Sequence, residues 1–244
     1  MIKAERLTKI FKDRKRGEIR AVDEISFTCE PGQVYGLLGP NGAGKTTTLR
    51  MLSTALRPSF GTALINGVDV VRDPQKVRSQ IGFLSGNTGL YARLNPREMV
   101  RYFGRLYGMT GDQIAERTRV IFDMLEMNDF ADTRNAKLST GMKQKVSIAR
   151  SVVHDPPTMV FDEPTTGLDV MSSRTIVQFI RHCRDDGKTV IFSTHIMSEA
   201  HRLCDKIGII HKGRLYYEGT IPQILEKTAT DTLEDAFIKI VGAE

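Results

Sequence analysis

Two short runs of residues carry groups that bind phosphate and magnesium. The first is rich in glycine, ends in lysine and threonine, and fits the pattern G-x-x-x-x-G-K-[ST]. Glycines let the backbone curl so that successive N–H groups point at phosphate oxygens, while the lysine reaches the terminal phosphates. The run predicts a nucleoside triphosphate site in which the Thr46 hydroxyl is also a magnesium ligand. The residues of this site are Gly39, Pro40, Asn41, Gly42, Ala43, Gly44, Lys45 and Thr46, with the adjoining Thr47.

The second run is a pair of acids, Asp162 and Glu163, at the end of an apolar segment. In an open α/β sheet the ends of parallel strands meet at one edge, so we expect this pair to lie beside the glycine-rich loop. Asp162 would then hold the magnesium shell, and Glu163 would orient or deprotonate the attacking water. The alternative is an ordinary strand end with exposed acids, which the upstream loop makes the weaker interpretation.

The surrounding elements are of the kind that could position both runs. An apolar strand is expected at residues 33–38, directly before the loop, and a helix at 45–56, directly after it. The N-terminus of that helix adds partial positive charge beside the phosphates. This order of strand, loop and helix is the context in which the glycine pattern predicts phosphate binding.

The rest of the chain alternates between strands and helices, with one exception. From residue 140 onward the alternation predicts a largely parallel sheet covered by helices on both faces. Residues 96–126 instead carry apolar side chains at helical spacing, which predicts a helical subdomain inserted in the α/β core. Alternating stretches at 2–7 and 24–29 predict half-buried strands, and residues 232–241 a short amphipathic helix.

Composition limits the class of protein. The 244 residues are 40% hydrophobic and 26% charged, which is typical of a folded globular chain. Apolar runs stay shorter than the roughly 18 residues that a membrane span needs, so membrane work would require a separate partner. Three widely spaced cysteines argue against disulfides and against a zinc site, and the formal charge of +6 assigns no function.

With these motifs in place, the chain resembles the ATP-binding subunits of ABC transporters over nearly its whole length. Leu138-Ser139-Thr140-Gly141-Met142 is similar to the family's signature motif, usually Leu-Ser-Gly-Gly-Gln, at the start of a predicted helix. The segment from Asp162 to Asp169 resembles the magnesium strand and the D-loop. Ser193-Thr194-His195 resembles the segment of the switch histidine, and Phe11 matches the aromatic residue that stacks on adenine.

The resemblance implies a fold and its divisions. It implies an α/β P-loop NTPase with a mainly parallel core sheet, an N-terminal antiparallel β subdomain and an inserted helical subdomain. The ATP-binding core would comprise residues 1–86 and 155–220, the helical signature subdomain 87–154, and a C-terminal helical tail 221–244.

It also implies an activity and a mode of assembly. ATP and magnesium would be the cofactors, and Glu163 and His195 the catalytic residues. Ser139 and Gly141 would contact the γ-phosphate bound by the other chain of a head-to-tail dimer.

Two departures from the family pattern stand out. Thr140 and Met142 replace the usual glycine and glutamine of the signature, while the serine and second glycine are kept. The glutamine of the family's Q-loop should fall near Gly86, where the sequence has none. Either Asn87 takes over as a magnesium ligand, or water completes the magnesium shell.

Within the family the sequence resembles exporter-type subunits, in particular the ATP-binding proteins of sodium-extruding transporters. The implied partners are a second ATPase subunit in a homodimer and an integral membrane permease, with no nucleic acid. The implied location is the cytoplasmic face of the cell membrane, held peripherally by the permease. The alternatives are an exporter of drugs or lipid-linked glycans, a soluble ABC ATPase of translation or DNA repair, and a regulatory domain that binds ATP without cleaving it.

Overall fold

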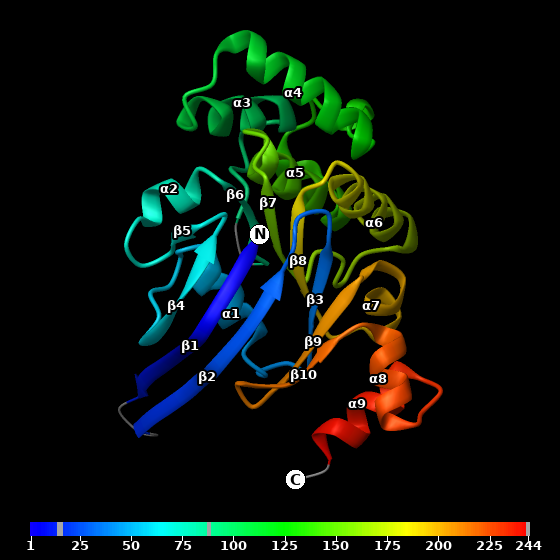
Figure 1. The fold of residues 1–244 in the computed structure, drawn as a ribbon. Coiled ribbons are helices and arrows are strands. Elements are labelled where there is room, and N and C mark those ends of the chain that lie inside the picture. The colour runs from blue at the N-terminus through cyan, green and yellow to red at the C-terminus, as the bar shows by residue number, and fades with distance from the viewer. Residues whose placement is uncertain (14–16, 87–88, 243–244) are drawn as a thin grey trace.

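The larger of two sheets organises the protein. A computed structural model gives the fold of residues 1–13, 17–86 and 89–242 (Figure 1). The strand order of this sheet is β10-β9-β3-β8-β7-β6, in which β10 runs antiparallel to β9 and the other neighbours are parallel. The predicted α/β class with a mainly parallel core sheet is therefore confirmed. The strands are β3 (Val34–Leu38), β6 (Ile81–Leu84), β7 (Thr158–Asp162), β8 (Thr189–Thr194), β9 (Lys206–His211) and β10 (Arg214–Gly219).

The central strands are apolar over most of their length because the sheet is covered on both sides. Successive side chains on a strand point to opposite faces. Phe161 and Phe192 pack on the face covered by helices, whereas Tyr35, Val160 and Ile191 pack on the face toward the second sheet. Every residue of β3, β7 and β8 is buried. A parallel strand of this kind gives a nearly continuous apolar run in the sequence.

The second sheet is antiparallel, with the strand order β2-β1-β4-β5. Its first two strands extend well beyond the predicted ranges 2–7 and 24–29. Register shifts interrupt their pairing, and Arg6 and Glu24 adopt positive φ angles of 46° and 50°. Such bulges break the alternation of buried and exposed residues, so the pattern ends before the strands do. The strands are β1 (Ile2–Asp13), β2 (Gly17–Cys29), β4 (Phe60–Ile65) and β5 (Val68–Asp69).

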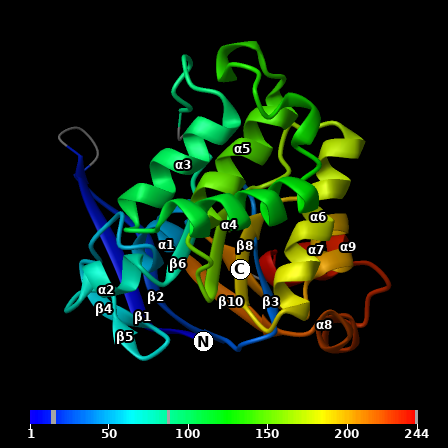
Figure 2. The same ribbon diagram turned by 90° about the horizontal axis from the view of Figure 1, so that it is seen from above.

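Helices α3 and α4 lie at the top of the molecule in Figure 1, and Figure 2 shows them with α5 from above. Asn95 and Thr110 form capping boxes at the starts of α3 and α4, so each helix begins at a residue that satisfies its free backbone N–H groups. These two helices fill the segment predicted to be helical. The helices of this part of the chain are α3 (Pro96–Leu106), α4 (Gly111–Met124) and α5 (Thr140–Val152).

The remaining helices differ from the predictions in places. α1 ends at Leu52 rather than at residue 56, and Thr54 just beyond it has a φ of 61°. Strand β10 and helices α2 and α8 were not predicted. No helix in the described part of the chain is long and apolar enough to cross a membrane. These helices are α1 (Lys45–Leu52), α2 (Pro74–Arg78), α6 (Val170–Asp185), α7 (Met197–Leu203), α8 (Ile221–Thr228) and α9 (Leu233–Val241).

The order of the parallel strands fixes where their ends meet. β8 lies between β3 and β7, with Leu38 opposite Thr194 and Asp162 opposite Ser193. The loop that follows β3, the acids that end β7 and the residues that end β8 therefore share one edge of the sheet.

Candidate active site

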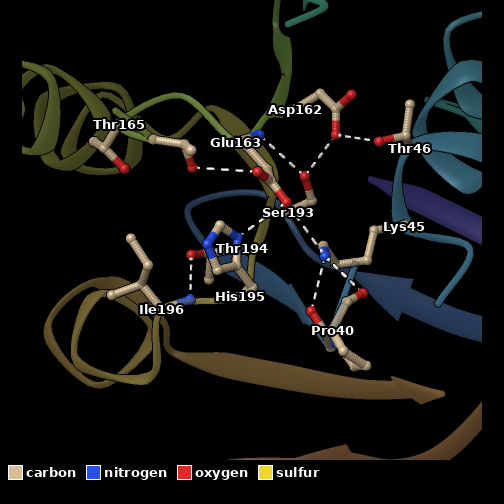
Figure 3. Close-up of polar contacts among 12 residues, drawn as sticks. Pro40, Lys45, Thr46, Asp162, Glu163, Thr165, Ser193, Thr194, His195 and Ile196 are labelled. Carbon is tan, nitrogen blue, oxygen red and sulfur yellow. Dashed lines mark hydrogen bonds and ion pairs between the residues drawn. The ribbon is translucent and has the colours of Figure 1, made fainter. Parts of the chain in front are cut away.

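The ammonium group of Lys45 is enclosed by oxygen atoms. Lys45 is the first residue of α1 and is only 4% exposed. Its Nζ donates hydrogen bonds to the carbonyl oxygens of Gly39, at 2.7 Å, and Pro40, at 3.1 Å. The same Nζ lies 3.3 Å from Oε1 of Glu163 (Figure 3). The lysine thus links the glycine-rich loop to the second acid of β7.

The loop is held tightly by neighbouring backbone. Gly44 has a φ of 106°, and a Cβ atom there would lie 2.6 Å from the carbonyl oxygen of Ala21 in β2. A Cβ atom on Gly39 would lie 2.2 Å from the carbonyl oxygen of Ile210 in β9. Only glycine allows these close approaches, which fix the loop between β2 and β9.

Asp162 is the centre of a cluster of hydroxyl groups. Its Oδ1 accepts hydrogen bonds from the Thr46 hydroxyl, at 3.0 Å, and from the Ser193 hydroxyl, at 2.7 Å. Ser193 Oγ in turn accepts a hydrogen bond of 3.0 Å from the backbone N–H of Glu163. Asp162 is 5% exposed, so its charge is compensated mainly by these donors.

This donor set fits magnesium. A carboxylate oxygen and a hydroxyl oxygen lie side by side, and magnesium prefers such hard oxygen ligands. Within residues 1–13, 17–86 and 89–242 there is no cluster of three or more His, Cys, Asp or Glu side chains that could hold a metal. Magnesium at Thr46 and Asp162 would share its shell with phosphate oxygens and water, as is usual for this ion.

Both carboxylate oxygens of Glu163 contact neighbouring side chains (Figure 3). Oε1 lies 3.2 Å from Nδ1 of His195, and Oε2 accepts a hydrogen bond of 3.2 Å from the Thr166 hydroxyl. Burial acts to raise the pKa of Glu163, but the hydrogen bond from His195 and the charge of Lys45 outweigh it and lower the pKa overall. The backbone of Glu163 has a φ of 48°, a sparsely populated conformation for a non-glycine residue.

The arrangement combines groups that phosphoryl transfer to water requires. A carboxylate kept in its ionised form can accept a proton from water. It lies beside a lysine at the N-terminus of a helix, where anionic phosphates are favoured.

Ser139 and Gly141 lie at the start of α5, next to the start of α6. Ser139 is exposed, and its hydroxyl accepts a hydrogen bond of 3.2 Å from the backbone N–H of Met142. Gly141 is buried, and a Cβ atom there would lie 2.2 Å from the Ser172 hydroxyl and 3.3 Å from an oxygen of Asp169. Gly141 therefore lies against the start of α6, and neither residue takes part in the hydrogen bonds described above for Lys45 and Asp162.

Phe11 is 41% exposed and lies opposite Ile19 in the β1–β2 pair. The ammonium of Lys9 is 5.3 Å from the centre of its ring. Ile19 is two residues from Ala21, whose carbonyl faces Gly44, so Phe11 lies on the strand pair that borders the loop.

The other predicted site residues lie as follows. Asn41 is exposed, Ala43 is buried and Thr47 is half-buried. Asn87 lies outside the described residues. A Cβ atom on the preceding Gly86 would be 4.0 Å from the carbonyl oxygen of Asp162.

Four polar residues of this region were not predicted. Ser193 and Thr166 contact Asp162 and Glu163 as described above. The Gln144 amide, from α5, donates a hydrogen bond of 2.8 Å to the carbonyl oxygen of Pro164, and Glu199 on α7 accepts hydrogen bonds from Thr165 and Thr194. Ser193 could have been predicted, because its hydroxyl lies at the carboxyl end of an apolar strand. Gln144 and Glu199 lie on helices, and no sequence pattern marks them as site residues.

Comparison with known proteins places these features in context. Residues 22–166 match the protein family described as ABC transporter. The chain is 43% identical to the ABC transporter ATP-binding protein NatA of Bacillus subtilis (strain 168), over 93% of both chains. It is 34% identical to the probable multidrug ABC transporter ATP-binding protein YbhF of Escherichia coli (strain K12), over 99% of this chain and 42% of that protein. A solved dimeric structure of a post-hydrolysis state of an ATP-binding cassette, bound to ADP and Pi, resembles it with a TM-score of 0.82 and 26% identity, over 91% of this chain and 99% of the other.

The two glycines of the loop with positive φ should respond differently to alanine. A side chain at Gly44 meets the Ala21 carbonyl at 2.6 Å, whereas one at Gly42, with a φ of 80°, meets nothing within 4 Å. Both substitutions carry backbone strain of about 1–2 kcal/mol, and overlap adds about 1–3 kcal/mol at Gly44 alone. Urea unfolding without nucleotide should therefore show Gly44→Ala to be the less stable variant by at least about 1 kcal/mol. Equal stability of the two variants would contradict the close approach of β2 to the loop.

Proposed function

The chain belongs to the ABC transporter family as an ATP-binding subunit with ATPase activity, and from this premise we propose that it powers export through a separate membrane subunit. The observation that carries the proposal is the position of Glu163, whose carboxylate is held between Lys45 and His195. We place the protein at the cytoplasmic face of the cell membrane, bound there by an integral permease.

The proposed reaction uses the groups of the sheet edge in sequence. The glycine-rich loop and Lys45 bind the phosphates of ATP, and Glu163 accepts a proton from the water that attacks the γ-phosphorus. The bond from the γ-phosphorus to the bridging oxygen breaks, giving ADP and phosphate. Thr46 and Asp162 hold magnesium, which when bound offsets the charge of the phosphates.

His195 and Phe11 have supporting roles in this proposal. His195 reaches the γ-phosphate and, through its contact with Oε1 of Glu163, helps to orient that carboxylate. Phe11 stacks on adenine from the exposed strand pair beside the loop, which its 41% exposure allows.

We propose that two copies assemble head to tail. Ser139 and Gly141 start a helix whose free N–H groups and serine hydroxyl suit an anion, here the γ-phosphate bound by the other copy. The exposure of Ser139 supports that role. A relative of known structure is dimeric, and we infer the same homodimer here, without nucleic acid.

Two further assignments belong to the proposal. We divide the chain into an ATP-binding core of residues 1–86 and 155–220, a helical signature subdomain of 87–154 and a helical tail of 221–244. We also keep Asn87 as a magnesium ligand in place of the Q-loop glutamine. The position of Gly86, the residue before Asn87, supports it, because a Cβ atom on Gly86 would lie 4.0 Å from the Asp162 carbonyl oxygen at the acidic end of β7.

Sodium is the proposed cargo. The proposal rests on the resemblance to the ATP-binding proteins of sodium-extruding transporters and on the 43% identity to NatA. Export of drugs is the second candidate, because the chain is also 34% identical to a probable multidrug transporter protein.

Replacing the proposed base should separate ATP binding from hydrolysis. An amide cannot accept a proton as a carboxylate does, so Glu163→Gln should lower the turnover number by at least about 100-fold. ATP affinity should stay within a few-fold, and gel filtration with ATP should show a stable dimer. Glu226→Gln on the exposed side of α8 is the matched control and should keep wild-type turnover. Unchanged turnover in Glu163→Gln, with monomer alone in ATP, would rule out the assignment.

The signature serine should affect the dimer and not the single chain. Ser139→Ala should remove cooperative ATPase activity while nucleotide affinity of the monomer stays within about two-fold. Gly141→Asp cannot make this distinction, because any side chain there collides with Ser172 of the same chain. Thr110→Ala removes a comparable exposed N-cap from α4 and controls for the loss of helix stability, about 1 kcal/mol. Equal loss of cooperativity in both variants would contradict a site shared between chains.

The cargo can be tested in cells and in vesicles. Cells lacking this subunit should accumulate sodium, and the chain reconstituted with its permease should move sodium only when ATP is present. Complementation with Glu163→Gln should fail, whereas complementation with Glu226→Gln should succeed. Equal sodium content with and without the subunit would favour the drug exporter.

A further inference from the structure

Glu199 joins the two segments that carry Glu163 and His195. It lies on α7, four residues after His195. Its Oε1 accepts a hydrogen bond from the Thr165 hydroxyl, and its Oε2 accepts one of 2.9 Å from the Thr194 hydroxyl. Thr165 follows Glu163 by two residues, and Thr194 directly precedes His195 (Figure 3). One carboxylate therefore fastens the turn after β7 to the end of β8.

The two hydroxyls need this acceptor. Thr165 is 4% exposed and Thr194 is 1% exposed, so water has little access to either. Thr194 Oγ1 already accepts a hydrogen bond of 2.9 Å from the backbone N–H of Ile196. The hydroxyl proton of Thr194 still needs an acceptor, and the Glu199 carboxylate supplies it.

The turn after β7 needs contacts that fix its conformation. Glu163 has a positive φ of 48°, and a conformation of this kind persists only where the surroundings impose it. The Ser193 hydroxyl on β8 accepts a hydrogen bond from the backbone N–H of Glu163, and the Gln144 amide on α5 donates one to the carbonyl oxygen of Pro164. Glu199 on α7 accepts one from the hydroxyl of the next residue, Thr165. Three elements thus fix three successive residues, of which the first carries the carboxylate that faces His195.

We propose that Glu199 is a positioning residue of the ATPase site, which fixes Thr165 and Thr194 and so holds Glu163 and His195 at their contact distance. The inference rests on the proposed function, because that function assigns hydrolysis to Glu163 and His195. Glu199 acts through the two threonines and not on the phosphate itself. Its loss should therefore slow the chemical step and leave ATP binding by the loop and Lys45 in place.

Steady-state ATPase kinetics of the full chain test this role. Glu199→Ala should lower kcat by about 10- to 100-fold, the range expected from a small misplacement of reacting groups, with the KM for ATP within about two-fold. Glu199→Gln keeps one acceptor oxygen on the same stem, so its kcat should lie between those of Glu199→Ala and the wild type. Ser198→Ala, the exposed neighbour on α7, is the matched control and should keep the wild-type kcat.

A double-mutant cycle separates positioning from general loss of structure. Thr165→Val removes the partner hydroxyl, so it should lower kcat in the same direction as Glu199→Ala. In the double variant the loss should be no larger than in Glu199→Ala alone, because Glu199→Ala already breaks the contact that Thr165→Val removes. Because Thr165→Val and Glu199→Gln conserve size, they still provide the test if Glu199→Ala does not fold.

Three results would overturn the proposal. These are a wild-type kcat in Glu199→Ala, kcat losses that multiply in the double variant, and a rise in KM with kcat unchanged. The wild-type chain distinguishes this failure from a failure of the proposed function. If the wild type hydrolyses ATP and the Glu199 variants match it, only the positioning role is wrong. If the wild type does not hydrolyse ATP, the proposed function fails and the role of Glu199 fails with it.

Discussion

The buried ammonium group of Lys45 constrains the arrangement of its surroundings. A charge removed from water costs several kcal/mol unless oppositely charged and polar groups surround it. Here two loop carbonyls and the Glu163 carboxylate supply the oxygens, at 2.7, 3.1 and 3.3 Å. These contacts require the loop to turn back over the start of α1 and require the end of β7 to approach it. Both requirements are met by the strand order of the large sheet, which brings the ends of β3 and β7 together on either side of β8.

The same edge is stiffened by groups that leave little freedom to the reacting residues. β2 and β9 approach the loop so closely that Gly44 and Gly39 have no room for a Cβ atom. Ser193, at the end of the intervening strand, bridges Asp162 and the backbone of Glu163. Hydroxyl and carboxylate groups are therefore held within hydrogen-bonding distance of one another. Fixed positions of this kind favour phosphoryl transfer, in which catalysis consists largely of positioning and charge stabilisation.

The helices at the top of the molecule carry a different part of the proposed mechanism. The start of α5 packs against the start of α6, and Gly141 is small enough for Ser172 and Asp169 to approach. The same helix sends Gln144 to the carbonyl of Pro164, next to Glu163. In our proposal the exposed Ser139 end of α5 faces the second copy, so one helix is connected both to the dimer contact and to the turn that carries the base. In that proposal the connection would be the physical route that links assembly to hydrolysis.

The sequence by itself determined the features that depend on neighbouring residues. The glycine-rich loop with Lys45, the acids at the end of an apolar strand and the helical nature of residues 96–126 are all local patterns, and the resemblance to a family followed from them. The predicted fold class was right because strands buried on both faces are apolar over most of their length, which leaves a visible run in the sequence. The extent of β1 and β2 was underestimated, since bulges at Arg6 and Glu24 break the period on which such a prediction depends. Only the tertiary structure decided that β8 lies between β3 and β7, and therefore that Ser193 bridges the two acids. It alone brought Glu199 and Gln144 to the turn after Glu163, because contacts between residues 20 to 34 positions apart are set by how helices pack and leave no period in the sequence.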